Sequence, residues 1–222
     1  MTDQSSESLT PREQRRANPE RVLTFTDGVF AIIITILVLE LKVPDLSSGQ
    51  SLGDSLSEMR PTMVAFVISF LLVGMYWTLH RNMFSEVRYV NTKVVWLNLL
   101  FLLPASMIPF AASVVGEYED NATALHLYGA VLILATLARM ALYWYLMRHP
   151  GLLWEPASRQ SRKLGWIIAV APLVVYAIAM ALADAMPTLS LTIYFALPLL
   201  YLGVIALLKT DPRTKGAAED VS

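Results

Sequence analysis

Six long apolar stretches decide what kind of fold this chain can adopt. A helix needs roughly 20 apolar residues to cross about 30 Å of hydrocarbon, and each stretch is close to that length. Only 16% of the residues are charged, whereas soluble domains average about 25%. The sequence therefore predicts an all-α membrane protein with six transmembrane helices. The stretches cover residues 22–41, 61–79, 94–115, 123–147, 164–183 and 188–208.

Basic residues gather on one side of these stretches. Four precede the first stretch, three lie between the second and third, four lie between the fourth and fifth, and three follow the sixth, which makes 14 of the 17. By the positive-inside rule that side is cytoplasmic, so we expect both termini in the cytoplasm. The predicted organisation is a cytoplasmic tail over residues 1–17, one six-span domain over residues 18–209 and a disordered cytoplasmic tail over residues 210–222.

Several kinds of chemistry are disfavoured by the residues present. The chain has no cysteine, and its three histidines are scattered, which argues against a bound metal centre. The spans contain no clustered nucleophile and base, so the sequence indicates a protein that is not an enzyme and needs no cofactor. The net charge of −1 does not suggest a nucleic-acid partner. A secondary carrier is disfavoured because no inverted repeat is visible, although this alternative stays open.

The first stretch carries an acidic residue inside the membrane. Asp27 lies near its cytoplasmic end. A charge there costs a few kcal/mol, so it normally has a partner or reaches water. Arg21 could pair with Asp27, or Asp27 could simply reach interfacial water. Similarly, Arg139 in the fourth stretch could snorkel to the interface or pair within the bundle, and Glu40 could be a solvated residue or part of a cation-attracting vestibule.

An apolar pattern with helical spacing follows Asp27. Ile32, Ile36 and Leu39 recur at four and three residues and share one helix face, with Thr35 beside it. Taken alone, such residues in a membrane helix are usually lipid contacts or packing. No Thr-Val-Gly-Tyr-Gly segment occurs in the chain, so the carbonyl filter of many potassium channels is excluded.

The beginning of the first stretch resembles a known signature. Arg21, Phe25-Thr26-Asp27 and Phe30-Ala31-Ile32 are similar to the R-x₃-F-S-D-x₂-F-A-I pattern of the transmembrane protein 175 potassium-channel family. Two departures are Thr26 in place of serine and Ala111 in place of a second proline. The resemblance is specific over residues 21–110 and rests on span count beyond them. Further similar positions are Tyr76-Trp77-x₂-His80, Phe84, Trp96-Leu97-Asn98-Leu99 and Pro109-Phe110.

The resemblance implies a homotetramer in which the first helix of each subunit lines a central pore. Ile32 would form the narrowest apolar ring, with Ile36 and Leu39 above it and Thr35 hydroxyls near a transiently bound K⁺. Such a ring gates by dewetting, and we expect modest selectivity for K⁺ over Na⁺. A proton leak is the alternative within this class. The single repeat and short tails are typical of a bacterial inner-membrane protein.

The same resemblance implies a polar cluster behind the pore that holds the first helix in place. Polar side chains at membrane depth need partners, and the expected members lie at matching depths near the cytoplasmic end. They are Arg21, Phe25, Thr26, Asp27, Trp77, His80 and Asn98.

Overall fold

In this computed structural model, residues 19–44, 49, 51–156 and 158–210 are described, apart from the side chains of residues 161 and 204–210. Over these ranges the chain forms helices and one isolated bridge between Val87 and Leu153. The helices are α1 (Pro19–Leu39), α2 (Leu52–Glu58), α3 (Arg60–Ser85), α4 (Thr92–Ala105), α5 (Ile108–Glu117), α6 (Ala122–Arg148), the 3₁₀ turn η2 (Pro150–Leu152), α7 (Arg159–Leu182) and α8 (Pro187–Thr210).

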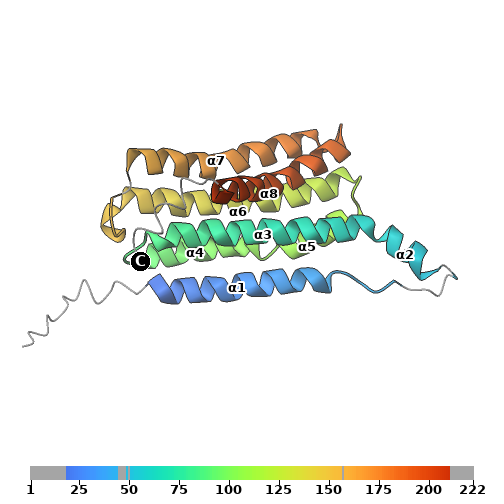
Figure 1. Cartoon of the computed structure of the whole chain (residues 1–222), viewed down its shortest axis with the longest axis horizontal. Helices are drawn as coiled ribbons and strands as arrows, with labels where there is room; N and C mark the ends of the chain where they lie inside the picture. The colour runs from blue at the N-terminus through green and yellow to red at the C-terminus, as the bar shows by residue number, and fades with distance from the viewer. Residues whose placement is uncertain (1–18, 45–48, 50, 157, 211–222) are drawn as a thin grey trace, which may run out of the picture.

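The long helices lie side by side in one bundle, in which α6 is central and α1 is peripheral (Figure 1). Helix α6 packs against α4, α5, α7 and α8, whereas the main contacts of α1 among the described residues are with α3, α4 and α5. The short helix α2 projects at the end of the bundle where α1 stops. This placement leaves one long face of α1 without a neighbour in the single chain.

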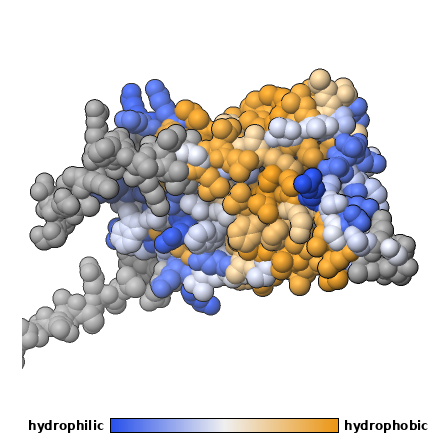
Figure 2. Space-filling view, turned by 45° about the vertical axis from the view of Figure 1, so that its right-hand side comes forward, coloured by the Kyte–Doolittle hydropathy of each residue, from blue (hydrophilic) through white to orange (hydrophobic). Residues whose placement is uncertain are grey.

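The surface of the bundle suits a bilayer. One face seen in space-filling view carries a broad apolar belt between two hydrophilic ends (Figure 2). In the part of the chain that is described, five helical segments are long and apolar enough to cross a membrane, and α8 adds a shorter apolar stretch over Pro187–Gly203. The prediction of an all-helical, multi-pass membrane protein is therefore confirmed, with five to six apolar helices. Which end faces the cytoplasm stays a prediction.

The third apolar stretch is not one continuous helix. Helix α4 ends at Ala105 and α5 begins at Ile108, with Ser106 and Met107 between them. Pro109 lacks the N–H that would continue the helical hydrogen bonds across this point. The two segments still run in line in Figure 1, so the pair crosses the bundle as one broken span.

Other helix limits differ modestly from the predicted stretches. Helix α3 runs to Ser85, six residues beyond the predicted stretch, and α8 runs to Thr210, the first residue of the predicted tail. The segment between the first two spans contains α2, which starts where the Ser51 hydroxyl accepts a hydrogen bond from the Asp54 N–H at 3.2 Å. The remainder of both predicted tails lies outside the described residues.

Hydrogen bonds of hydroxyl groups, to one another and to a backbone carbonyl, join the helices of the core. The Tyr76 hydroxyl on α3 lies 2.8 Å from the Thr136 hydroxyl on α6, and Ser69 lies 3.1 Å from Tyr128 in the same pair of helices. The Tyr194 hydroxyl on α8 donates to the carbonyl of Leu125 on α6 at 3.3 Å. A Cβ at Gly129 would overlap that hydroxyl, so the glycine permits the close approach of α6 and α8.

Candidate functional site

One face of α1 is built into the bundle. Its buried residues recur every three or four positions, which places them on a single side of a helix. The apolar members pack in the main hydrophobic core, where the Phe30 ring lies 5.9 Å from that of Phe101 on α4. The buried residues of α1 are Thr26, Phe30, Ile33 and Leu37.

The opposite face of α1 is apolar and uncovered. Ile32, Ile36 and Leu39 are 58%, 38% and 75% exposed in the single chain. Thr35 is also exposed on this side, and its hydroxyl donates to the carbonyl of Ile32 at 2.9 Å. Because the hydroxyl hydrogen is used within the helix, the oxygen keeps lone pairs that can accept from water or contact a cation. The four residues therefore form a continuous, mainly apolar strip that contains one hydroxyl oxygen.

A buried chain of hydrogen bonds ties α1 to α3 and α4. The Asn98 side-chain amide donates to the Thr26 hydroxyl at 2.8 Å, and its carbonyl oxygen lies 2.7 Å from Nε2 of His80. Since the Asn98 nitrogen is the donor to Thr26, the oxygen must accept, and His80 carries its proton on Nε2. Thr26, His80 and Asn98 are all buried, and none of them has a buried side-chain atom without a partner.

Aromatic rings enclose the His80 imidazole. Its ring stacks on Phe84 with centroids 4.4 Å apart and on Phe101 with centroids 5.5 Å apart. These two rings pack against the buried imidazole and restrict its orientation. The position of Thr26 relative to α3 and α4 is therefore set by a buried network.

A second link between α1 and α3 lies outside this buried chain. Trp77 donates its indole N–H to the Asp27 carboxylate at 2.7 Å, in an exposed setting. The Arg81 guanidinium lies 5.7 Å from the centroid of the Trp77 ring. Sequence reasoning placed Asp27 and Trp77 together but missed Arg81, although its position one helical turn after Trp77 was the available signal.

Two predicted cluster members are not brought into it. Arg21 is exposed and has no hydrogen bond or ion pair to any described residue. Phe25 is 54% exposed and precedes Ile32 by seven residues, so it lies on the uncovered face of α1. Their contribution to the cluster stays a prediction.

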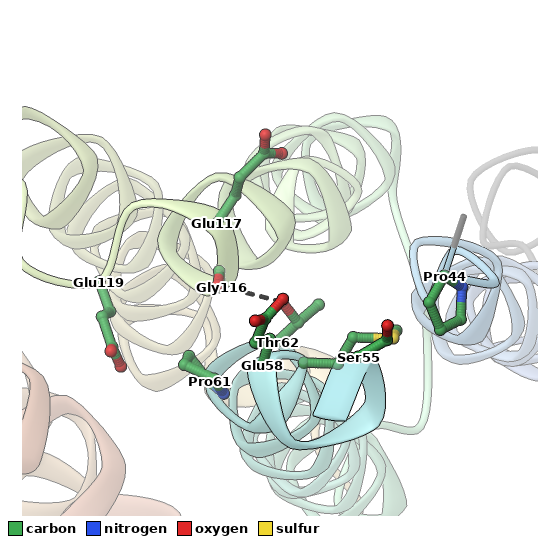
Figure 3. Close-up of a pocket in the computed structure, with 9 residues that line it drawn as sticks. Pro44, Ser55, Glu58, Pro61, Thr62, Gly116, Glu117 and Glu119 are labelled. Atoms are coloured by element: carbon green, nitrogen blue, oxygen red, sulfur yellow. Dashed lines mark hydrogen bonds between the residues drawn. The ribbon is translucent and has the colours of Figure 1, made fainter. Parts of the chain in front are cut away.

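An acidic hollow lies where α2, α3 and α5 meet, beyond the end of α1 (Figure 3). Its volume is about 360 Å³, and the Thr62 hydroxyl on its wall donates to the carbonyl of Gly116 at 3.0 Å. The carboxylates of Glu117 and Glu119 point apart in Figure 3, and the described residues contain no group of acidic or histidine side chains that could hold a metal ion. The hollow can attract cations but has no ligand set to coordinate one.

Known proteins share both this sequence and this fold. The model of the family described as endosomal/lysosomal potassium channel TMEM175 matches residues 21–109. A potassium channel of Streptomyces collinus is 39% identical over 140 residues, covering 61% of this chain and 68% of the relative. A potassium channel of Chryseobacterium sp. is 33% identical over 182 residues, covering 82% of this chain and 91% of the relative.

A solved structure agrees with these relatives. The crystal structure of a lysosomal potassium-selective channel TMEM175 homologue from Chamaesiphon minutus matches with a TM-score of 0.72 and 27% identity, covering 83% of this chain and 96% of that one. A longer relative from cattle, 28% identical over 152 residues and matched over 32% of its length, is named an endosomal/lysosomal proton channel.

The helical bundle and these matches place the chain in a family of membrane ion channels, which is not a class of enzymes. The chain belongs to the TMEM175 family. The resemblance carried by the signature around Asp27 is confirmed, because the family match spans residues 21–109.

Proposed function

We propose that four copies of this chain form a potassium channel whose central pore is lined by α1. The observation that carries this proposal is the uncovered strip of Ile32, Thr35, Ile36 and Leu39, which lies opposite the face that anchors α1 in the bundle. A strip on a peripheral helix can be covered by copies of itself around a four-fold axis. The two bacterial relatives named potassium channels support the choice of ion.

Gating in this proposal depends on the apolar ring. Four Ile32 side chains make the narrowest point, with Ile36 and Leu39 further along the pore. A narrow ring of this kind loses its water, and ions then cannot cross it. Opening requires the four α1 helices to dilate or rotate, and the closed network at Thr26 provides a fixed end for that movement. Thr26 lies six residues before Ile32, which is about 9 Å along a helix.

Selectivity in this proposal comes from partial dehydration. The α1 strip carries no acidic residue at the level of Ile32, so a ring of charge does not select the ion. The Thr35 oxygens replace part of the hydration shell, and K⁺ loses water at lower cost than Na⁺. We therefore propose modest selectivity for K⁺, with transient contacts near Ile32 and Thr35. The proposed location is a bacterial cell membrane with both termini cytoplasmic.

The test is ion flux through the purified full chain in liposomes. Potassium flux and the reversal potential against Na⁺ are measured for wild type, Ile32→Asn and the matched variant Ile178→Asn. Ile178 is 50% exposed on α7, on a helix outside the proposed pore. We expect Ile32→Asn to increase flux and to raise Na⁺ permeability by roughly tenfold, because a polar ring stays wet. Ile178→Asn is expected to behave as wild type.

Two other results would redirect the proposal. If folded tetramers of wild type and of Ile32→Asn both show no flux, the channel assignment is refuted, while the fold and the family are unaffected. Saturable flux that Ile32→Asn does not change would favour a carrier.

Proton conduction is a second candidate, because the cattle relative is named a proton channel. The same liposomes loaded with a pH-sensitive dye separate the two. A pH gradient is imposed with equal K⁺ on both sides and valinomycin to carry the compensating charge. A dye response faster than in protein-free liposomes would favour proton flux. A dye response equal to that of protein-free liposomes, together with K⁺ flux in the first assay, would favour potassium.

A further inference from the structure

Helix α6 contains a buried arginine with an incomplete set of partners. Arg139 is 4% exposed, and its Nη2 donates to the carbonyl of Ile168 on α7 at 3.0 Å. Its Nε has no partner, and no carboxylate of the described residues lies within ion-pair distance. The structure therefore favours pairing within the bundle over snorkelling, but the partner is a single carbonyl.

This arrangement leaves the charge of Arg139 uncompensated. The ionisable groups that interact with it include the phenols of Tyr76, Tyr176 and Tyr201, and a phenol carries no negative charge at neutral pH. A buried guanidinium costs several kcal/mol unless an anion or a full set of hydrogen bonds offsets it. The described chain supplies one hydrogen bond and no anion.

Arg139 lies on the wall of a cavity between α3, α6 and α7. The volume of the cavity is about 420 Å³, which is within the range of small-molecule sites. Leu79 on α3 and Glu86, the residue after its end, both line the cavity and are seven residues apart, so it is about 10 Å long. Between the two ends its wall is mainly apolar, with Met83, Met147 and Ile168 among the lining residues.

Local packing holds this cavity open. A Cβ at Gly165 would overlap the Tyr143 hydroxyl, so the glycine lets Tyr143 lie against α7 beside the cavity. At the other end, the N–H of Trp154 donates to the carbonyl of Glu86 at 3.0 Å, which fixes the segment that carries Glu155. These two contacts fix parts of the cavity wall.

The two ends of the cavity differ in charge. Arg139 stands at one end, and the exposed Glu86 and Glu155 stand at the other, with Arg159 and Arg162 in the first turn of α7 nearby in sequence. The Arg139 end carries one positive charge and no negative charge. The outer end carries both positive and negative charges, so an anion can enter there. A second anionic group on the same ligand would be repelled by Glu86 and Glu155.

We propose that this cavity binds a monoanionic group attached to a short apolar body. The anionic group hydrogen-bonds to the guanidinium of Arg139, and the apolar body lies along the wall formed by α3 and α6. A carboxylate on a water-soluble acid and the phosphodiester of an acidic membrane lipid both have this chemistry. The proposal is independent of the α1 pore, because none of the residues that line the cavity lies on α1.

The first experiment compares hexanoate with hexanol, which share a chain length and differ in charge. The thermal unfolding midpoint of the purified full chain is measured in neutral detergent with each compound. Hexanoate at ten times its Kd is expected to raise the midpoint by about 3 °C, and hexanol is expected to have little effect. In Arg139→Met the two compounds should act alike.

A second variant guards against a folding defect in Arg139→Met. Asn82 is exposed and lines the cavity, so Asn82→Trp fills the entrance while leaving Arg139 and the core unchanged. It should abolish the hexanoate shift without lowering the midpoint of the unliganded protein. A hexanoate shift of equal size in wild type, Arg139→Met and Asn82→Trp would overturn the proposal.

Native mass spectrometry distinguishes the two sources of the anion. Wild type and Arg139→Met are mixed with phosphatidylglycerol or with phosphatidylcholine as a zwitterionic control. Selective retention of phosphatidylglycerol by wild type, without a hexanoate shift, would identify a lipid ligand. A hexanoate shift without lipid retention would identify a soluble acid, and absence of both signals would overturn the proposal.

Discussion

Two of the buried polar sites in the bundle differ in how fully their hydrogen bonds are satisfied. At the first, Thr26, Asn98 and His80 form a continuous chain of hydrogen bonds from α1 through α4 to α3. At the second, Arg139 reaches one carbonyl on α7 and has an unpaired Nε beside a cavity. Both are buried within helices that are apolar enough to cross a membrane.

The difference indicates different roles. A closed network of neutral groups adds stability and fixes geometry, because each member would be costly without the others. A buried charge with one partner adds little stability, because its desolvation offsets what it gains. The Thr26–Asn98–His80 site is therefore suited to positioning α1. The Arg139 site is suited to binding a ligand.

The largest effect on stability is expected from a substitution of Asn98. Asn98→Leu is similar in size but removes the acceptor for His80 and the donor for Thr26 together. We expect the free energy of unfolding to fall by about 2–4 kcal/mol, since two buried polar groups lose their partners. Thermal unfolding in neutral detergent measures this as a midpoint lowered by several degrees.

Asn82→Leu provides the matched control for Asn98→Leu, because Asn82 is exposed at the end of α3. The control is expected to unfold within about 0.5 kcal/mol of wild type. Equal effects of the two substitutions would mean that the buried chain does not hold α1.

A smaller effect is expected at the α1 end of the same chain. Thr26→Val preserves the shape and removes one hydroxyl, so the Asn98 amide loses its acceptor while the His80 bond remains. We expect a loss of about 1–2 kcal/mol in the free energy of unfolding. Thr26→Ser, which keeps the hydroxyl, should restore most of it. The same unfolding assay distinguishes the two variants, and a serine variant as unstable as the valine variant would point to lost packing.

Much of the fold could be predicted from sequence because the apolar stretches are long. Their positions agree with the helices to within a few residues at most ends. The break between α4 and α5 could not be placed, since Pro104 and Pro109 both lie in that stretch and tertiary packing decides which one interrupts the helix. The two-turn helix α2 was also missed, because its seven residues are too few for a periodic signal.

Which residues make up the buried site could be predicted from the sequence. Which of them hydrogen-bond to one another could be predicted only in part. The family resemblance grouped Thr26, His80 and Asn98, and their matching depths agreed with it, but depth does not determine the rotation of each helix. For that reason, the sequence did not reveal that Asn98 bridges the other two while Asp27 pairs separately with Trp77. The environment of Arg139 depends on how α7 approaches α6, a tertiary feature with no signal in the sequence around Arg139 itself.

The smallest effect on stability is expected at Arg139, whose charge has no anionic partner among the described residues. Arg139→Met keeps a long side chain and removes the unsatisfied guanidinium, but it also takes the donor from the Ile168 carbonyl, which has no helical N–H partner because Pro172 lies four residues on. Without added anion, we expect the free energy of unfolding to stay within about 1 kcal/mol of wild type or to rise, as for other buried charges replaced by apolar residues. Arg148→Met on the exposed end of α6 controls for the change in net charge. A loss of more than about 2 kcal/mol in Arg139→Met alone would mean that the guanidinium is fully satisfied inside the bundle. In that case the two buried sites would be of one kind, and the cavity beside Arg139 would have no charge to offer a ligand.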